Sequence, residues 1–91
     1  MKRTKNYLIC YDISDEKRLS KVAKYLEKVA FRIQYSIYYL QSPSTQEFLE
    51  IQEELKLRIN EKEDDVKIYT IKNNGFYAGI AVNLNDPFII T

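Results

Sequence analysis

The side chain best placed for chemistry in this sequence is the carboxylate of Asp12. It stands near the end of an apolar run that begins at Tyr7, and Ser14 follows two positions later. A run this short, bounded by polar residues, predicts a strand that is covered on both faces. An aspartate at the exit of such a strand can bind a metal ion, or it can order the turn into the next helix. The residues by themselves leave both roles open and favour the turn.

The residue types that are missing exclude several kinds of chemistry. The chain has no histidine and a single cysteine, Cys10. Nucleophilic catalysis by a serine–histidine or cysteine–histidine pair is therefore excluded, and so is a zinc site built on imidazole. Cys10 lies inside the apolar run, and we interpret it as a small buried hydrophobic residue. An enzyme of this composition has to use carboxylates, hydroxyls, basic side chains and an oxygen-binding metal such as Mg²⁺.

A helix is expected over residues 14–30, with Ser14 as its N-cap, because apolar residues recur there at helical spacing. The opposite face of this helix carries five basic residues: Lys17, Arg18, Lys21, Lys24 and Lys28. A face of this kind is usually only solvated, but its position next to Asp12 keeps contact with phosphate groups open. The formal net charge of +1 adds no sign of nucleic-acid binding.

Residues 31–40 alternate between apolar and polar side chains, which indicates β-structure. They form either one long strand or a hairpin folded at Tyr35-Ser36, and no glycine or asparagine marks a turn there. Ser44 and Glu47 have the spacing of a capping box. The expected later elements are a helix from Ser44 to about Asn60, a charged and solvated connection over 61–65, a strand over 66–71 and a last strand over 79–84.

This order of elements predicts one α+β domain with both helices on one face of an open sheet. With the hairpin, the chain forms a ferredoxin-like βαββαβ sandwich with an additional C-terminal strand, and its first strand is central. Apolar residues at positions 88–90, together with an exposed sheet face, favour a homodimer. No apolar stretch approaches the length of a membrane span, and a lone cysteine fits a reducing compartment, so we expect a cytoplasmic protein.

Several blocks of the chain resemble one known family. The blocks are YLICYDISD over residues 7–15, KR over 17–18, KVAKYL over 21–26, RIQYSIY over 32–38 and DVKIY over 65–69. Together they resemble the small CRISPR-associated adaptation proteins, the second of the two universal spacer-acquisition proteins. The resemblance implies a ferredoxin-like homodimer and favours the hairpin at Tyr35-Ser36. It also implies a ferredoxin-like domain over 1–75 and a C-terminal strand and tail over 76–91 that docks on the partner subunit.

The resemblance also implies a site. Members of the family are described as metal-dependent endonucleases on RNA or DNA, and as dimeric scaffolds that hold the spacer integrase around a duplex DNA prespacer. The acid of the family falls on Asp12, which is then the catalytic and metal-binding residue, with one Mg²⁺ shared by the two Asp12 side chains of a dimer. We expect Arg32, which matches an arginine of the family, and the basic residues Lys17, Arg18 and Lys21 to contact nucleic acid.

Three functions are compatible with these observations. The first is a dimeric scaffold that binds nucleic acid together with the integrase, and the second is a Mg²⁺-dependent endonuclease. The third is a non-catalytic ferredoxin-like binding module unrelated to CRISPR, because this fold serves many functions. One departure from the family bears on the first two. Leu19 and Ser20 follow Arg18 where many members continue with arginine, which weakens the basic patch.

Overall fold

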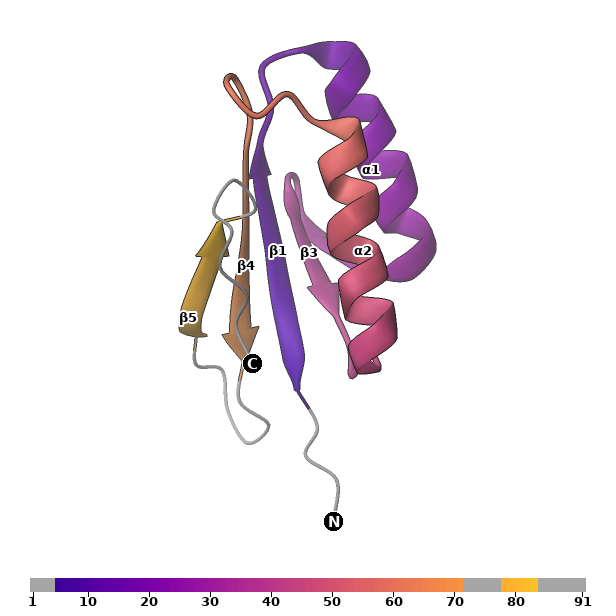
Figure 1. Cartoon of the computed structure of the whole chain (residues 1–91), viewed down its shortest axis with the longest axis vertical. Coiled ribbons are helices and arrows are strands. Elements are labelled where there is room, and N and C mark those ends of the chain that lie inside the picture. The colour runs from indigo at the N-terminus through magenta and orange to yellow at the C-terminus, as the bar shows by residue number, and fades with distance from the viewer. Residues whose placement is uncertain (1–4, 72–77, 84–91) are drawn as a thin grey trace.

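The computed structural model describes residues 5–71 and the backbone of residues 78–83. Its elements are β1 (Asn6–Asp12), α1 (Glu16–Val29), β2 (Phe31–Gln34), β3 (Ile37–Leu40), α2 (Thr45–Arg58), β4 (Asp65–Ile71) and β5 (Ala78–Asn83). This order confirms the predicted βαββαβ arrangement with an additional C-terminal strand (Figure 1).

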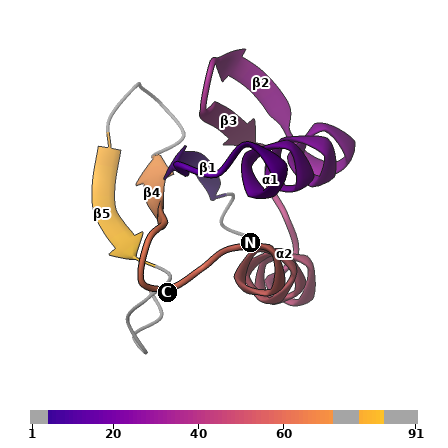
Figure 2. The ribbon, with the colours of Figure 1, turned by 90° about the horizontal axis from the view of Figure 1, so that it is seen from above.

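The five strands form one antiparallel sheet in the order β2-β3-β1-β4-β5. Strand β1 is central, as the sequence predicts, and it pairs with β3 on one side and β4 on the other. Both helices cover the same face of the sheet, which leaves the other face uncovered by helices (Figures 1 and 2). The molecule is therefore a two-layer sandwich of helices on a sheet.

The core lies between the helices and the sheet. Its fully buried apolar side chains come from both layers and include Ile9, Tyr38, Ile68, Val22, Leu26 and Leu55. Side chains of β1 alternate between the two faces, so that Tyr7, Ile9 and Tyr11 are buried under the helices. On the other face of β1, Asn6, Leu8 and Cys10 are half-buried and Asp12 is exposed. The prediction that β1 is fully covered on both faces is therefore correct for the helix side only.

The first helix begins later than the sequence predicts. Asp15, not Ser14, is the N-cap, because its side-chain Oδ2 accepts a hydrogen bond from the Arg18 N–H at 3.0 Å. Asp15 has extended backbone angles, φ −92° and ψ 126°, as an N-cap requires. Ser14 thus belongs to the connection between β1 and α1. This connection lies next to the expected site.

Residues 31–40 form a hairpin, which confirms the division at Tyr35-Ser36. Ser36 lies in the left-handed region with φ 74°, a conformation that costs a residue other than glycine about 1 kcal/mol. The Ser36 carbonyl accepts a hydrogen bond from the Tyr11 N–H at 3.1 Å. A contact with β1, more distant in sequence, therefore helps to hold a turn that local residue types do not mark.

The capping box of α2 is present as predicted. The Ser44 Oγ accepts from the Glu47 N–H at 3.0 Å, and the Glu47 Oε1 accepts from the Ser44 N–H at 2.9 Å. The helix ends at Arg58, two residues before the expected end. Across residues 5–71 and 78–83, no helix has the length and apolar character needed to cross a membrane.

The last strand, β5, pairs antiparallel with β4 of the same chain. It matches the expected strand over 79–84 to within one residue at each end. The expected docking of residues 76–91 on a partner subunit concerns residues that lie mostly outside the described part of the chain. That docking stays a prediction.

Candidate metal and nucleic-acid site at the carboxyl end of the central strand

Asp12 is the last residue of β1 and is exposed. Its neighbour Tyr11 is buried under the helices, with 8% of its surface exposed. Because side chains alternate along a strand, Asp12 points to the sheet face that the helices leave uncovered. The structure therefore places the predicted acid at the end of the central strand, on the face available to another molecule.

A second carboxylate, Asp65, lies opposite Asp12. The antiparallel register of β1 and β4 pairs the two residues directly, and both are exposed. Directly opposed residues have Cβ atoms about 5 Å apart and point to the same face. Sequence reasoning missed Asp65. The signal that could have found it is its position, because Asp65 comes directly before the strand expected over 66–71, whereas Asp12 ends the first strand. Only the register between the two strands reveals the pair.

The oxygen donors at this position suit a hard cation such as Mg²⁺ in type. The part of the chain that the structure describes holds no group of three or more aspartate, glutamate, cysteine or histidine residues able to bind a metal. Mg²⁺ commonly keeps several waters and binds through one or two carboxylates together with substrate phosphates, so the Asp12 and Asp65 carboxylates fit it in type and number. One Mg²⁺ per dimer stays a prediction.

Two other groups of β1, the Cys10 thiol and the Tyr11 hydroxyl, precede Asp12. Neither is suited to acid–base or nucleophilic chemistry near neutral pH. Burial, and after it the neighbouring Tyr38, raise the pKa of Tyr11 to about 12. Burial also raises the pKa of the half-buried Cys10 thiol, although Lys67 opposes the shift. The expectation that Cys10 is buried is correct only in part, because Cys10 is half-buried and lies on the sheet face without helices. Candidate chemistry therefore rests on Asp12 and Asp65.

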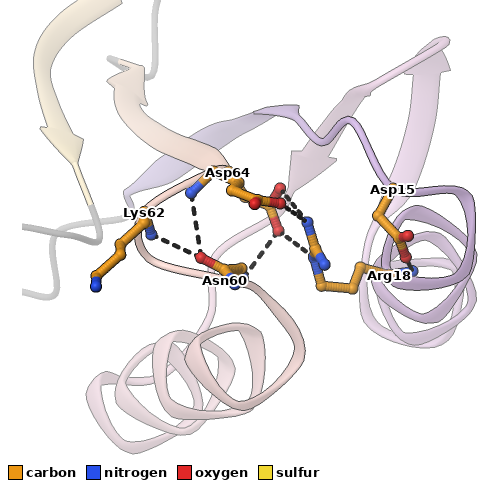
Figure 3. Close-up of polar contacts among 6 residues, drawn as sticks. Asp15, Arg18, Asn60, Lys62 and Asp64 are labelled. Atoms are coloured by element: carbon orange, nitrogen blue, oxygen red, sulfur yellow. Dashed lines mark hydrogen bonds and ion pairs between the residues drawn. The ribbon is translucent and has the colours of Figure 1, made fainter.

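Arg18 forms an ion pair with a buried carboxylate (Figure 3). Its Nε donates to Asp64 Oδ2 at 2.7 Å and its Nη2 to Asp64 Oδ1 at 3.1 Å. Its Nη2 also lies 3.0 Å from Glu63 Oε1. The Asp64 side chain has 0% exposure, so the expectation that residues 61–65 are solvated is wrong for Asp64. The physical reason is that Arg18 supplies a bidentate partner for the charge.

The Asp64 carboxylate also accepts backbone hydrogen bonds. The Asn60 N–H donates to its Oδ2 at 2.8 Å, and the backbone of Ser14 contributes a further hydrogen bond. The hydrogen bond from Arg18 is the largest cause that holds the pKa of Asp64 below its usual range, against the opposing effect of burial. This network joins the connection that follows Asp12 to the connection that precedes Asp65.

The other basic residues expected at the site lie in different places. Lys17 and Lys21 are exposed on α1, and no ion pair involves them within the described residues. Arg32 Nη1 lies 3.9 Å from Glu27 Oε2, and its guanidinium lies over the Tyr35 ring at 5.4 Å. The structure brings neither the lysines nor Arg32 next to Asp12 in one chain.

The sheet register gives the separation of Arg32 from Asp12. Arg32 is opposite Tyr38, which is opposite Ile9 of β1. Arg32 is therefore two strands and three residues away from Asp12, or about 14 Å between Cα atoms. It also shares the helix-side face with Tyr38, whereas Asp12 points to the other face.

The comparisons with known proteins agree with the fold and the sequence. Residues 5–78 match the family model described as CRISPR associated protein Cas2. A protein of Thermodesulfovibrio yellowstonii, named CRISPR-associated endoribonuclease Cas2 2, is 41% identical over 81 residues, which are 89% of this chain and 88% of that protein. A protein of Nitrosomonas europaea, named CRISPR-associated endoribonuclease Cas2 1, is 37% identical over 75 residues, which are 82% of this chain and 70% of that protein.

A solved structure gives the same result. The crystal structure of Streptococcus pyogenes Cas2 superposes with a TM-score of 0.69 at 32% identity, covering 76% of this chain and 88% of that one. These matches, with the family model over residues 5–78, support the CRISPR-associated family over a binding module unrelated to CRISPR. On both sequence and structure, the chain belongs to the CRISPR-associated protein Cas2 family.

Proposed function

We propose that this protein is a dimeric scaffold that binds nucleic acid, together with the spacer integrase, during the acquisition of CRISPR spacers. The observation that carries the proposal is the division of the molecule into two functional sides. One side is an uncovered sheet face with apolar residues, and the other is a helix with exposed lysines. Such a molecule can bind a second copy through one side and a polyanion through the other.

The uncovered sheet face supports the dimer. Leu8 of β1 is opposite Tyr39 on one side and Tyr69 on the other, and all three are half-buried. Phe31, opposite Tyr39, is 63% exposed. Aromatic and aliphatic side chains in a continuous row across a sheet are typical of an interface between proteins. A symmetric partner on this face would bring the second Asp12 towards the first.

The exposed cations support nucleic-acid binding. We propose that Lys17, Lys21 and Arg32 contact phosphate groups, which bind lysine and arginine irrespective of sequence. Arg18 stays a predicted contact, and its pairing with Asp64 and Glu63 argues for an indirect role. Duplex DNA is the expected partner, with RNA as the second possibility. The lone cysteine supports a cytoplasmic location.

Hydrolysis of phosphodiesters is the second candidate function. Its support is the name endoribonuclease of the relatives and the exposed Asp12 at the end of the central strand. The two Asp12 side chains of a dimer would hold one Mg²⁺, and Asp65 offers a further carboxylate. A divalent cation, when bound, stabilises the charge that develops on the phosphoryl oxygens. The chain itself supplies the carboxylates and the dimer that brings them together.

The test compares wild type with Asp12→Asn on RNA and duplex DNA, with Mg²⁺ and with EDTA. We expect cleavage by wild type that EDTA stops and that Asp12→Asn lowers by about a hundredfold or more, because the amide is a poor ligand for the cation. Glu16→Gln removes another exposed carboxylate and serves as the control that retains cleavage.

The same proteins test the scaffold. Asp12→Asn is expected to bind duplex DNA as well as wild type, because phosphate contacts and not the acid carry the affinity. Cleavage that survives Asp12→Asn would rule out Asp12 as the catalytic residue. A wild-type protein that fails to bind any duplex at low salt, alone and with the integrase, would rule out the scaffold.

A further inference from the structure

The lysines of α1 form a single stripe. The four residues are Lys17, Lys21, Lys24 and Lys28, and all of them are exposed. At 3.6 residues per turn they fall within an arc of about 60° on the helix surface. The buried residues Val22 and Leu26 lie on the opposite side of the helix. The lysine stripe therefore points away from the sheet and into solvent along most of the helix.

The stripe takes no part in the ion pairs that join residues within 5–71. Among the described residues, the ion pairs involve Arg18, Arg32 and Arg58, and none of the four lysines takes part in one. Arg58 pairs with Glu54 at 2.6 Å and also lies over the Tyr25 ring at 4.6 Å. Arg18 and Arg58 therefore bind within the protein, and the exposed Arg32 has only a long contact of 3.9 Å with Glu27. The four lysines remain available to an external anion.

The two helices of the layer carry opposite charge. α1 has five basic and two acidic residues, whereas α2 has four acidic and two basic residues. The acidic residues of α2 are Glu47, Glu50, Glu53 and Glu54. The helices lie side by side on the same face of the sheet (Figure 2). Although the overall charge is only +1, α1 is strongly positive and its neighbour α2 is negative.

From this arrangement we infer that the phosphate backbone of a bound duplex runs along α1, from Lys17 to Lys28, and that the acidic helix α2 limits it on one side. The inference rests on the proposed binding of nucleic acid and adds Lys24 and Lys28 to the contact surface. The eleven residue steps from Lys17 to Lys28 span about 16 Å of helix, which corresponds to about five base pairs of duplex. Four lysines along that length neutralise successive phosphates without reading bases.

The test is a pair of double variants with the same change in net charge. Lys24→Gln with Lys28→Gln removes half of the stripe, and Lys56→Gln with Lys62→Gln removes two exposed lysines outside it. Binding of a duplex of random sequence is measured for each purified protein between low and physiological salt. Far-UV circular dichroism with thermal melting verifies that each variant folds like wild type.

We expect the stripe variant to bind the duplex at least about tenfold more weakly than wild type. The magnitude of the slope of log K against log salt should fall by at least about 1.8, because each chain loses two phosphate contacts. The control variant retains the affinity and slope of wild type. Equal weakening in both variants would overturn the inference, because net charge alone would then carry the binding. Wild-type affinity in the stripe variant would overturn it while leaving the scaffold intact.

Two further outcomes distinguish a failure of this inference from a failure of the proposed scaffold function. If wild type binds single strands as tightly as the duplex and with the same salt dependence, the assignment of a duplex to the stripe is wrong. If wild type binds no nucleic acid at low salt, the proposed scaffold fails and the inference fails with it.

Discussion

Asp64 and Arg18 are 46 residues apart in the chain, and their side chains meet beside the candidate site. Burial of a carboxylate is costly unless it is paired and hydrogen-bonded. Here two hydrogen bonds from Arg18 and one from the Asn60 backbone offset that cost. The pair joins the first turn of α1 to the connection that precedes Asp65. At the scale of single residues, the positions of Asp12 and Asp65 therefore depend on an ion pair between two other residues, Arg18 and Asp64.

Replacing Asp64 is expected to destabilise the protein. Asp64→Ala should lower the free energy of unfolding by about 3 kcal/mol, because it breaks a buried ion pair by removing one partner. Urea unfolding measures the change. Asp65→Ala is the matched control, since Asp65 is the exposed neighbour and faces the like charge of Asp12, and we expect a change of about 0.5 kcal/mol or less. An equal loss in both variants would contradict a special role for Asp64.

The same pair predicts a pH dependence. Because the fold lowers the pKa of Asp64, its contribution to stability is complete above the unfolded pKa of about 4. The contribution is then lost as the pH falls through the lower pKa of the folded state. We therefore measure how far the free energy of unfolding decreases as the pH falls from about 5 to the acid limit of folding. We expect this decrease to be smaller for Asp64→Asn than for wild type. Parallel pH profiles would show that Asp64 has no shifted pKa.

At the scale of elements, the two helices begin in different ways. α2 begins with a reciprocal capping box, whereas α1 begins with a single hydrogen bond that the Asp15 side chain accepts from the Arg18 N–H. Both devices satisfy backbone N–H groups that have no partner inside a helix. Helix α2 carries Phe48, Ile51 and Leu55 into the core, so the position of its first turn determines how these side chains pack.

Removal of the capping hydroxyl of α2 should have a measurable cost. Ser44→Ala is expected to lower the free energy of unfolding by about 1 kcal/mol, because the Glu47 N–H loses its partner. Thermal or urea unfolding gives the value. Ser20→Ala is the control, because Ser20 is exposed in the middle of α1 and alanine favours helix there. A loss as large for Ser20→Ala as for Ser44→Ala would contradict the capping role.

At the scale of the whole molecule, the functions are divided between two sides of the sheet. The helices and their charged surfaces lie on one side, and Asp12, Asp65 and Leu8 point to the other. A single chain therefore presents its carboxylates on one side and its lysine stripe on the other. A dimer through the uncovered sheet face would place the carboxylates inside and leave both α1 helices exposed at the outside.

The proposed dimer makes a specific expectation for Leu8. Leu8→Lys places a charge in the centre of the uncovered face, and we expect it to convert the dimer into a monomer, because unpaired charges are costly in an interface. Sedimentation velocity measures the state at several concentrations. Leu57→Lys is the control, because Leu57 lies on α2 with 77% exposure, and it should leave the dimer unchanged. A dimer that persists in Leu8→Lys would place the interface elsewhere.

The sequence by itself determined the order of the elements outside residues 31–40 and the capping box at Ser44. These features depend on periodicity and on residues three or four positions apart, so they can be predicted locally. The hairpin over 31–40, and with it the central position of β1, was favoured by the family resemblance. The start of α1 was predicted one residue early, because serine and aspartate are both good N-caps. The turn at Ser36 also escaped local signals, since its backbone is held by a hydrogen bond from β1.

Only the tertiary structure decided how the site is composed. The opposition of Asp12 and Asp65 depends on the register of two strands that are more than 50 residues apart. The pairing of Arg18 with Asp64 depends on how the first turn of α1 meets the connection before β4. Arg18, one of five basic residues on one expected face, turns out to serve the fold, whereas Lys24 on the same helix stays exposed. Residue type predicts which chemistry is possible, but side-chain direction depends on long-range packing, which no local pattern contains.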